Sequence, residues 1–387
     1  MRIVDIREMA VPINSTIRNA VFDFSEMTTS IVAVVTDIVR NGKPIVGFAF
    51  NSTGRYACGA QMRARFIPRL LRAKPDTLLD DKGGIDPAKA LTCMMQGEKP
   101  GAHSDRSIAI GTIETALWDA IAKIEDKPLY RVLAERFNGG KSADKVFCYV
   151  GGGWYRPGQT IADVQDEMRR HLDAGYTMIK IKVGGLPIAE DLRRVEAALA
   201  IVGFGERLAV DANAKFNREE ALTYAKALAP LKLRWFEEPV DPIDFEAYAE
   251  LASVYDPPLG TGENLYSMQD VKNLVAFGGF RAGWDVIQVD PPQAYGYGTY
   301  AQTLAMLEAR GWSRSSLWPH GGNQMSLALT AGLSLGGCES YPGVFGVFAG
   351  YADDARVVDG YLKPSDRPGI GFEGQQALYA TMRKLID

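Results

Sequence analysis

The sequence predicts an α/β fold, in which a parallel βα barrel carries a smaller α+β capping domain. The chain has 387 residues, and a barrel of up to ~250 residues leaves room for one further domain. Its first ~100 residues indicate strands followed by helices, as in an α+β domain. From about residue 145, short apolar strands alternate with helices, and an ionisable residue recurs where each strand ends.

Composition narrows the functional class. Apolar residues make up 47% of the chain, enough to fill a large core, and the net charge is only −4. Such a weak charge argues against nucleic acid or a membrane surface as the main partner. No apolar run reaches the ~18 residues of a membrane span, and the charged start 1–8 reads as a strand and not as a signal peptide. None of the cysteines forms a C-x-x-C pair, which predicts free, mostly buried thiols of a cytosolic protein: Cys58, Cys93, Cys148 and Cys338.

The capping domain is expected over residues 1–125. Strands are predicted near 3–6, 30–36 and 45–50, and Asn41-Gly42 is a strong hairpin-turn signal between the last two. Apolar residues from Ile108 to Ile124 recur at helical spacing, and Pro128 ends the pattern. We expect this helix to join the two domains.

The barrel prediction depends on spacing. Predicted strands at 178–182, 208–211, 234–237, 259–263, 286–290 and 316–320 end in Lys182, Asp211, Glu237, Glu263, Asp290 and His320. The separations are 29, 26, 26, 27 and 30 residues, close to one βα unit of ~30 residues. Because the carboxyl ends of parallel barrel strands form the active-site face, six functional groups should converge there. The alternative is scattered charges at loop starts, but a charge at the same point of six units needs a shared reason.

Three of these groups predict a metal site. Asp211, Glu237 and Glu263 end adjacent strands, where they would repel one another without a cation. Mg²⁺ prefers oxygen ligands and keeps positions open for substrate, so we expect Mg²⁺ as the cofactor. The alternative is a set of ion pairs with lysine or arginine. Glu238 competes with Glu237, but only one of the two points inward on a strand.

Acid–base groups surround the predicted metal. Lys180 and Lys182 share one face of a strand, and two ammonium groups there should lower each other's pKa, which suits a general base. Asp290 can hold the tautomer of His320 and make it a general base or acid. Glu339, at the next strand end, could hydrogen-bond a substrate carboxylate if it is protonated. A base, a metal and a second acid–base group suit removal of a proton beside a carboxylate, because the metal offsets the second negative charge.

At this point the chain resembles a known family. The acidic strand ends, Lys-x-Lys and the Asp/His pair are similar to the mandelate racemase subgroup of the enolase superfamily, as are segments 116–119, 127–129, 235–239 and 368–371. The resemblance implies a modified TIM barrel of (β/α)7β type over 126–355 and a segment 356–387 that returns to the capping domain. It also implies Mg²⁺ on the three carboxylates, a small-molecule carboxylate substrate and a homo-oligomer.

Within the subgroup, the resemblance is strongest to its tartrate dehydratase branch, at 17–20, 51–56, 98–101 and 319–326. It implies that Lys182 takes the α-proton while Lys180 tunes it, and that His320, paired with Asp290, protonates the departing 3-hydroxyl to give a 2-keto acid. It also implies substrate contacts from Asn19, Asn51 and Lys99, besides Glu339. Pro291-Pro292 departs from that branch beside the predicted mouth, which puts the substrate in question. A racemase or epimerase needs nearly the same residues, and a non-catalytic barrel is the third alternative.

Overall fold

An antiparallel sheet opens the chain in the computed structural model, which describes residues 1–387. Its strands β1 (Ile3–Pro12), β2 (Thr28–Arg40) and β3 (Lys43–Phe50) pair in chain order. Asn41 and Gly42 between β2 and β3 have φ of 52° and 75°, the left-handed pair that a tight hairpin turn requires. The predicted strands and hairpin of the capping domain are confirmed.

Helices complete the capping domain. They are α1 (Gly59–Gln61), α2 (Ile67–Arg72), α3 (Pro87–Met95) and α4 (Asp105–Ile124), with α5 (Leu129–Phe137) following. Helix α4 is buried from Arg106 to Ala122 and packs on β3 and β2. Gly47 permits this contact, because a Cβ there would lie 2.0 Å from the carbonyl oxygen of Ala116. The predicted helix, ending before Pro128, is therefore present.

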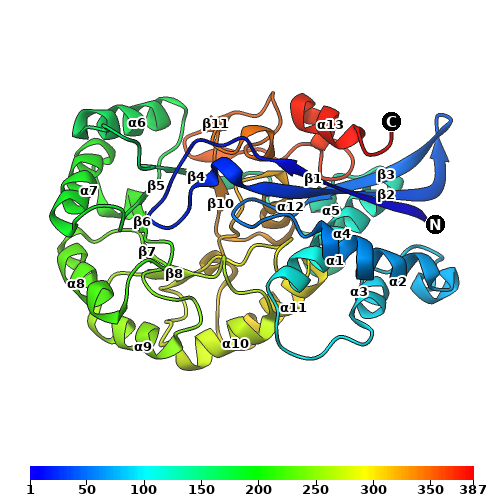
Figure 1. Ribbon diagram of the computed structural model, residues 1–387, viewed down its shortest axis with the longest axis horizontal. Coiled ribbons are helices and arrows are strands. Elements are labelled where there is room, and N and C mark those ends of the chain that lie inside the picture. Colours follow the sequence, from blue (N-terminus) through cyan, green and yellow to red (C-terminus); the bar gives the residue numbers. More distant parts are fainter.

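The barrel is a closed parallel ring (Figure 1). Its strands are β4 (Val146–Gly152), β5 (Ile179–Lys182), β6 (Leu208–Asp211), β7 (Phe236–Glu237), β8 (Leu259–Thr261), β9 (Val286–Ile287) and β10 (Cys338–Ser340). Strands β4 to β9 pair in chain order, and β10 returns to pair with β4. Leu317 fills the place between β9 and β10: it bridges to Ile287, and its carbonyl oxygen accepts the N–H of Gly336.

Seven helices cover the ring from outside (Figure 1): α6 (Ile161–Asp173), α7 (Ile188–Val202), α8 (Arg218–Leu228), α9 (Phe245–Val254), α10 (Met268–Phe277), α11 (Tyr297–Glu308) and α12 (Gln324–Leu333). One helix follows each strand position except the last, so the (β/α)7β prediction is confirmed. Large side chains fill the ring: Tyr149, Met178, Ala209, Trp235, Val286 and Trp318 form one buried cluster.

Two details of the strand prediction are wrong. The segment 316–320 is no regular strand, since a single bridge and a few hydrogen bonds hold it. The first barrel strand, β4, was not among the predicted ones. It ends in Gly151-Gly152-Gly153, so the ionisable residue that marked the other strand ends is missing.

The last residues connect the barrel to the capping domain. Strands β11 (Val357–Val358) and β12 (Tyr361–Leu362) form a hairpin, and β12 pairs with β4. Helix α13 (Gln376–Arg383) then contacts β2, and both chain ends lie on this side (Figure 1). The domain limits 1–125, 126–355 and 356–387 and the homo-oligomer stay predictions. All four cysteines are free and only Cys93 is not fully buried; none of the helices is long and apolar enough to cross a membrane.

Candidate active site

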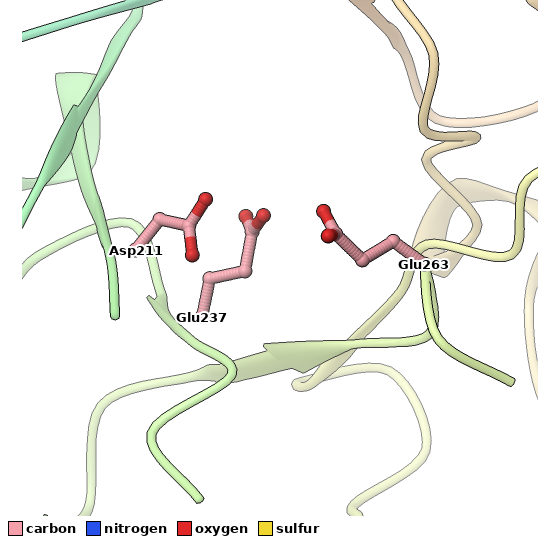
Figure 2. A group of neighbouring side chains, drawn as sticks. All are labelled: Asp211, Glu237 and Glu263. Carbon is pink, nitrogen blue, oxygen red and sulfur yellow. The ribbon is translucent and has the colours of Figure 1, made fainter. Parts of the chain in front are cut away.

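Three carboxylates meet at the carboxyl ends of neighbouring strands. Asp211 ends β6, Glu237 ends β7, and Glu263 lies two residues beyond β8. Figure 2 shows the three side chains directed toward a common space, and one oxygen from each lies within 4.8 Å of the others. Gly262 is required before Glu263, because its φ is 137° and a Cβ would lie 2.7 Å from the backbone nitrogen of Gln288.

This donor set fits Mg²⁺. All three ligands are oxygens, Asp211 and Glu237 are buried, and the Glu263 side chain is only 11% exposed. Burial and the neighbouring Asp211 raise the pKa of Glu237 to about 8, even though Lys180 opposes that rise. Carboxylates packed this closely need positive charge, and three of them leave coordination positions open on a hard dication. The predicted cluster is therefore assembled as expected.

The two lysines of β5 differ in their distance from the active-site cavity, since Lys182 lines it and Lys180 lies behind it. Lys182 contacts Asp211, lies over the Trp154 ring with its Nζ 4.7 Å from the ring centre, and lines the active-site cavity. Lys180 is fully buried, with its Nζ 2.5 Å from Glu237 and 2.6 Å from Glu339. Burial disfavours its charge, but the two glutamates outweigh burial and raise the pKa of Lys180 well above its usual range. These carboxylates shift the pKa of Lys180 in the direction opposite to the predicted effect of Lys182, and the base role of Lys182 stays a prediction.

Asp290 and His320 form the predicted pair. Nδ1 of His320 lies 2.9 Å from Oδ2 of Asp290, and the hydroxyl of Ser52 donates to the same oxygen over 2.7 Å. Nε2 of His320 therefore faces the cavity, 3.4 Å from Glu263. Burial lowers the pKa of His320, but Glu263 and the bond to Asp290 outweigh it and raise that pKa to about 9.

Capping and barrel residues together close a cavity over these groups. The capping domain contributes Asn19, Phe22, Phe24, Thr53, Gly54 and Arg55. The barrel contributes Trp154, Lys182, Asn213, Glu263, His320, Tyr341 and Phe345. The volume is only about 20 Å³, room for roughly one water molecule. The cavity in this structure is too small for an organic substrate, and active-site lids commonly move to admit one.

Comparison with known proteins identifies the family. The family described as "Enolase C-terminal domain-like" matches residues 163–378, more than half of the chain. The chain belongs to the enolase superfamily. It is 29% identical over 350 residues to L-talarate/galactarate dehydratase of Salmonella typhimurium, covering 89% of this chain and 81% of that enzyme. It is 28% identical over 273 residues to arabinonate dehydratase of Saccharolobus solfataricus, covering 69% and 70%.

Solved structures agree in fold. A racemase from Streptomyces coelicolor with bound magnesium superposes with a TM-score of 0.79 at 25% identity, covering 97% of this chain and 99% of that one. A mutant of L-talarate/galactarate dehydratase liganded with Mg and L-glucarate gives 0.75 at 26% identity, covering 95% and 87%.

Several predicted substrate contacts of this enolase-superfamily chain differ from expectation. Asn51 is wholly buried outside the cavity, and Lys99 is exposed and lies away from it. Asn19 does line the cavity, although its Oδ1 accepts the N–H groups of Val21 and Phe22. Glu339 is fully buried and does not line the cavity, although its Oε2 lies 3.8 Å from Nε2 of His320.

Glu339 also differs in its charge. Burial raises its pKa, but Lys180 and His320 outweigh burial and lower that pKa below its usual range. Tyr341 donates to the same carboxylate. The sequence allows a substrate hydrogen bond from Glu339 only if it is protonated, and its lowered pKa opposes that state; the carboxylate contacts Lys180 at 2.6 Å instead.

Sequence reasoning missed part of the site. Ser52 on Asp290, Arg55 in the cavity and Trp154 beside Lys182 were not predicted as site residues. Glu238 is buried with a φ of 40°, and both its oxygens accept the side-chain amide of Asn264. Ser52 and Arg55 had a usable signal, since both lie in segment 51–56, which carries part of the resemblance.

Proposed function

We propose that this protein is a magnesium-dependent dehydratase that converts a hydroxy acid of the acid-sugar or tartrate type to a 2-keto acid. One observation carries the proposal: Lys182 and His320 line the same small cavity as Glu263 of the acidic cluster. A substrate whose carboxylate lies at that cluster has a base and an acid within reach. The similar dehydratases of acid sugars support the same reaction.

Asp211, Glu237 and Glu263 would hold the cation. When bound, Mg²⁺ polarises the substrate carboxylate and offsets the negative charge that develops as the α-proton leaves. Lys182 takes that proton, and the electron pair of the broken C–H bond forms the double bond to the β-carbon. His320 gives a proton to the departing β-hydroxyl, which leaves as water. The enol that remains tautomerises to a 2-keto acid.

The surrounding residues position the acid and the base. Asp290 accepts from Nδ1 of His320 and leaves Nε2 directed at the cavity, while Ser52 fixes Asp290 from the capping domain. Lys180 pairs with three carboxylates behind Lys182, those of Asp211, Glu237 and Glu339, and offsets their negative charge. Lys182 and His320 are both buried, and their low exposure to water strengthens these electrostatic contacts.

A racemase is the second candidate. Lys182 and His320 could exchange protons on the two faces of an α-carbon without loss of hydroxide, and a similar solved structure is that of a racemase. A barrel kept only for binding or assembly would be expected to lack at least one of the six predicted strand-end groups. All six are present in this chain, which argues against the non-catalytic alternative.

The test is 2-keto acid formation, measured with semicarbazide, over tartrates, galactarate, talarate, galactonate and arabinonate, with Mg²⁺ or with EDTA. We expect keto acid from at least one of them, abolished by EDTA. Solvent deuterium exchange at the α-carbon is followed in parallel by NMR. Deuterium exchange at the α-carbon with retention of the hydroxyl would favour the racemase proposal over the dehydratase proposal. No deuterium exchange on any compound would contradict both proposals.

A further inference from the structure

We propose that Arg55 binds the far carboxylate of the substrate, so that the enzyme selects diacids over monoacids. The inference rests on the proposed function, whose substrate class it makes specific. The relatives leave this choice open, since galactarate and talarate carry two carboxylates and arabinonate carries one.

Arg55 is the only cation that the capping domain contributes to the cavity. It lies in the loop after β3, and the other capping residues around the cavity are uncharged: Asn19, Phe22, Phe24, Thr53 and Gly54. The acidic cluster and Lys182 lie on the barrel side. Arg55 is therefore the one capping-domain cation that the free end of a substrate held at the acidic cluster can meet in this cavity.

The guanidinium of Arg55 is fixed before any ligand binds. Its Nε donates to the hydroxyl of Tyr266 over 2.5 Å, Nη1 donates to the carbonyl of Gly54, and Cζ lies 5.8 Å from the centre of the Tyr266 ring. Tyr266 in turn donates to Asn264 over 3.2 Å. Because these contacts already order a long side chain, binding loses little further conformational entropy.

Arg55 forms no ion pair, although Glu263 and Glu238 lie near enough to help raise its pKa against the effect of burial. The protein places no carboxylate oxygen within 4.0 Å of the guanidinium, and Nη2 makes no hydrogen bond to the protein. This differs from the other charges beside the cavity, since Lys182 contacts Asp211 and His320 contacts Asp290. A partly buried guanidinium with a free N–H edge matches a carboxylate in charge and in planar geometry.

The alternative is a structural Arg55 that only ties the capping loop to Tyr266. Such a role affects every substrate equally, whereas a carboxylate contact affects only diacids. The experiment therefore compares pairs of substrates that differ at one end: galactarate with galactonate, and tartrate with the matching four-carbon monoacid.

Three proteins are compared by kcat/KM for keto acid formation. Arg55→Met removes the charge and keeps most of the volume. Arg18→Met is the matched control, since Arg18 carries the same charge on the same domain, pairs with Asp23 at 2.6 Å and is 60% exposed outside the cavity. We expect Arg55→Met to lower kcat/KM for the diacid about 100-fold and to change that for the monoacid less than about 3-fold. Arg18→Met should change neither beyond that range.

A wild-type preference for monoacids, or an equal loss of kcat/KM on both members of a pair in Arg55→Met, would overturn the inference. Either result would leave the proposed dehydratase reaction standing. Binding is measured separately, because the proposed reaction can fail on its own. With Mg²⁺ present, succinate should raise the thermal midpoint of the wild type more than butyrate does, and Arg55→Met should remove that difference. Equal midpoints for both ligands would contradict the role of Arg55, whatever reaction the enzyme performs.

Discussion

The side-chain amide of Asn51 donates a hydrogen bond of 3.1 Å to the carbonyl oxygen of Arg55, so a residue outside the cavity fixes one inside it. The Oδ1 of Asn51 accepts the backbone N–H of Ser30 and the hydroxyl of Thr29. Its Nδ2 also lies 3.3 Å from the carbonyl of Tyr56. Asn51 therefore ties the loop after β3 to β2 and has no hydrogen-bonding capacity left for a substrate.

Replacing Asn51 with alanine should lower both stability and activity. The buried N–H of Ser30 and the carbonyl groups of Arg55 and Tyr56 would lose their partner, and we expect the free energy of unfolding to fall by about 2 kcal/mol. The measurements are urea unfolding and kcat/KM at saturating Mg²⁺. A variant with wild-type stability and reduced kcat/KM would instead support direct substrate binding, as the sequence alone indicated.

Removal of one acidic ligand should abolish the response to Mg²⁺. At a concentration 100 times Kd, a ligand that binds only the folded state stabilises it by about 2.7 kcal/mol. We expect the wild type to gain thermal stability with Mg²⁺ and Glu263→Gln to lose that gain. Glu190→Gln makes the same chemical change at an exposed position after β5 and should respond like the wild type. An undiminished response of Glu263→Gln would place the metal elsewhere.

Substitutions of Lys180 and Lys182, the two lysines of β5, should have different effects on activity and stability. Lys182 faces the cavity, so Lys182→Ala should slow deuterium exchange at the substrate α-carbon about 10³-fold. Its partner Asp211 keeps Lys180 at 3.5 Å, so the loss of stability should be smaller than for Lys180. Lys180→Met leaves the buried Glu237 and Glu339 without their ammonium partner, and we expect a loss of about 3–5 kcal/mol in unfolding free energy. NMR exchange and thermal unfolding separate the two effects. A stable Lys180→Met with normal exchange would remove its positioning role.

Much of the site was predictable because a parallel barrel converts sequence spacing into position. Each βα unit advances one strand around the ring, so residues such as Asp211 and Glu237, 26 apart, lie side by side. The same regularity located Lys182 opposite Asp211 in the ladder. The positions of the three carboxylates and of Lys182 follow from that period.

The capping residues were not predictable in this way. Asn51 and Lys99 lie in turns, where the same amide or ammonium can face a ligand, the backbone or solvent, and only tertiary packing decides. Arg55 is likewise set by its contact with Tyr266, more than 200 residues along the chain. The charge of Glu339 depends on Lys180, which no linear spacing places against it.

Glu114 gives a prediction outside the active site. This residue of α4 is buried, and its carboxylate accepts the N–H groups of Tyr297 and Gly298 at the start of α11, each over 2.9 Å. Gly296 makes room for it, since a Cβ there would lie 2.0 Å from Oε2 of Glu114. The contact joins the helix of the capping domain to a helix of the barrel. Burial raises the pKa of Glu114 from 4.5 to about 7, although these hydrogen bonds oppose the rise.

The sign of the pH effect follows from this raised pKa. Between pH 4.5 and about 7 the folded protein keeps a proton on Glu114 that the unfolded chain has lost, so raising the pH weakens the fold across this window. The contribution is complete below pH 4.5 and is lost as the pH passes 7, with a total of about 3 kcal/mol. Glu114→Gln cannot titrate, so its unfolding free energy in urea should fall less steeply from pH 5 to 7. Glu135→Gln, half-exposed on α5, should follow the wild type. Parallel profiles for all three proteins would show that Glu114 is already ionised in the folded state at pH 5.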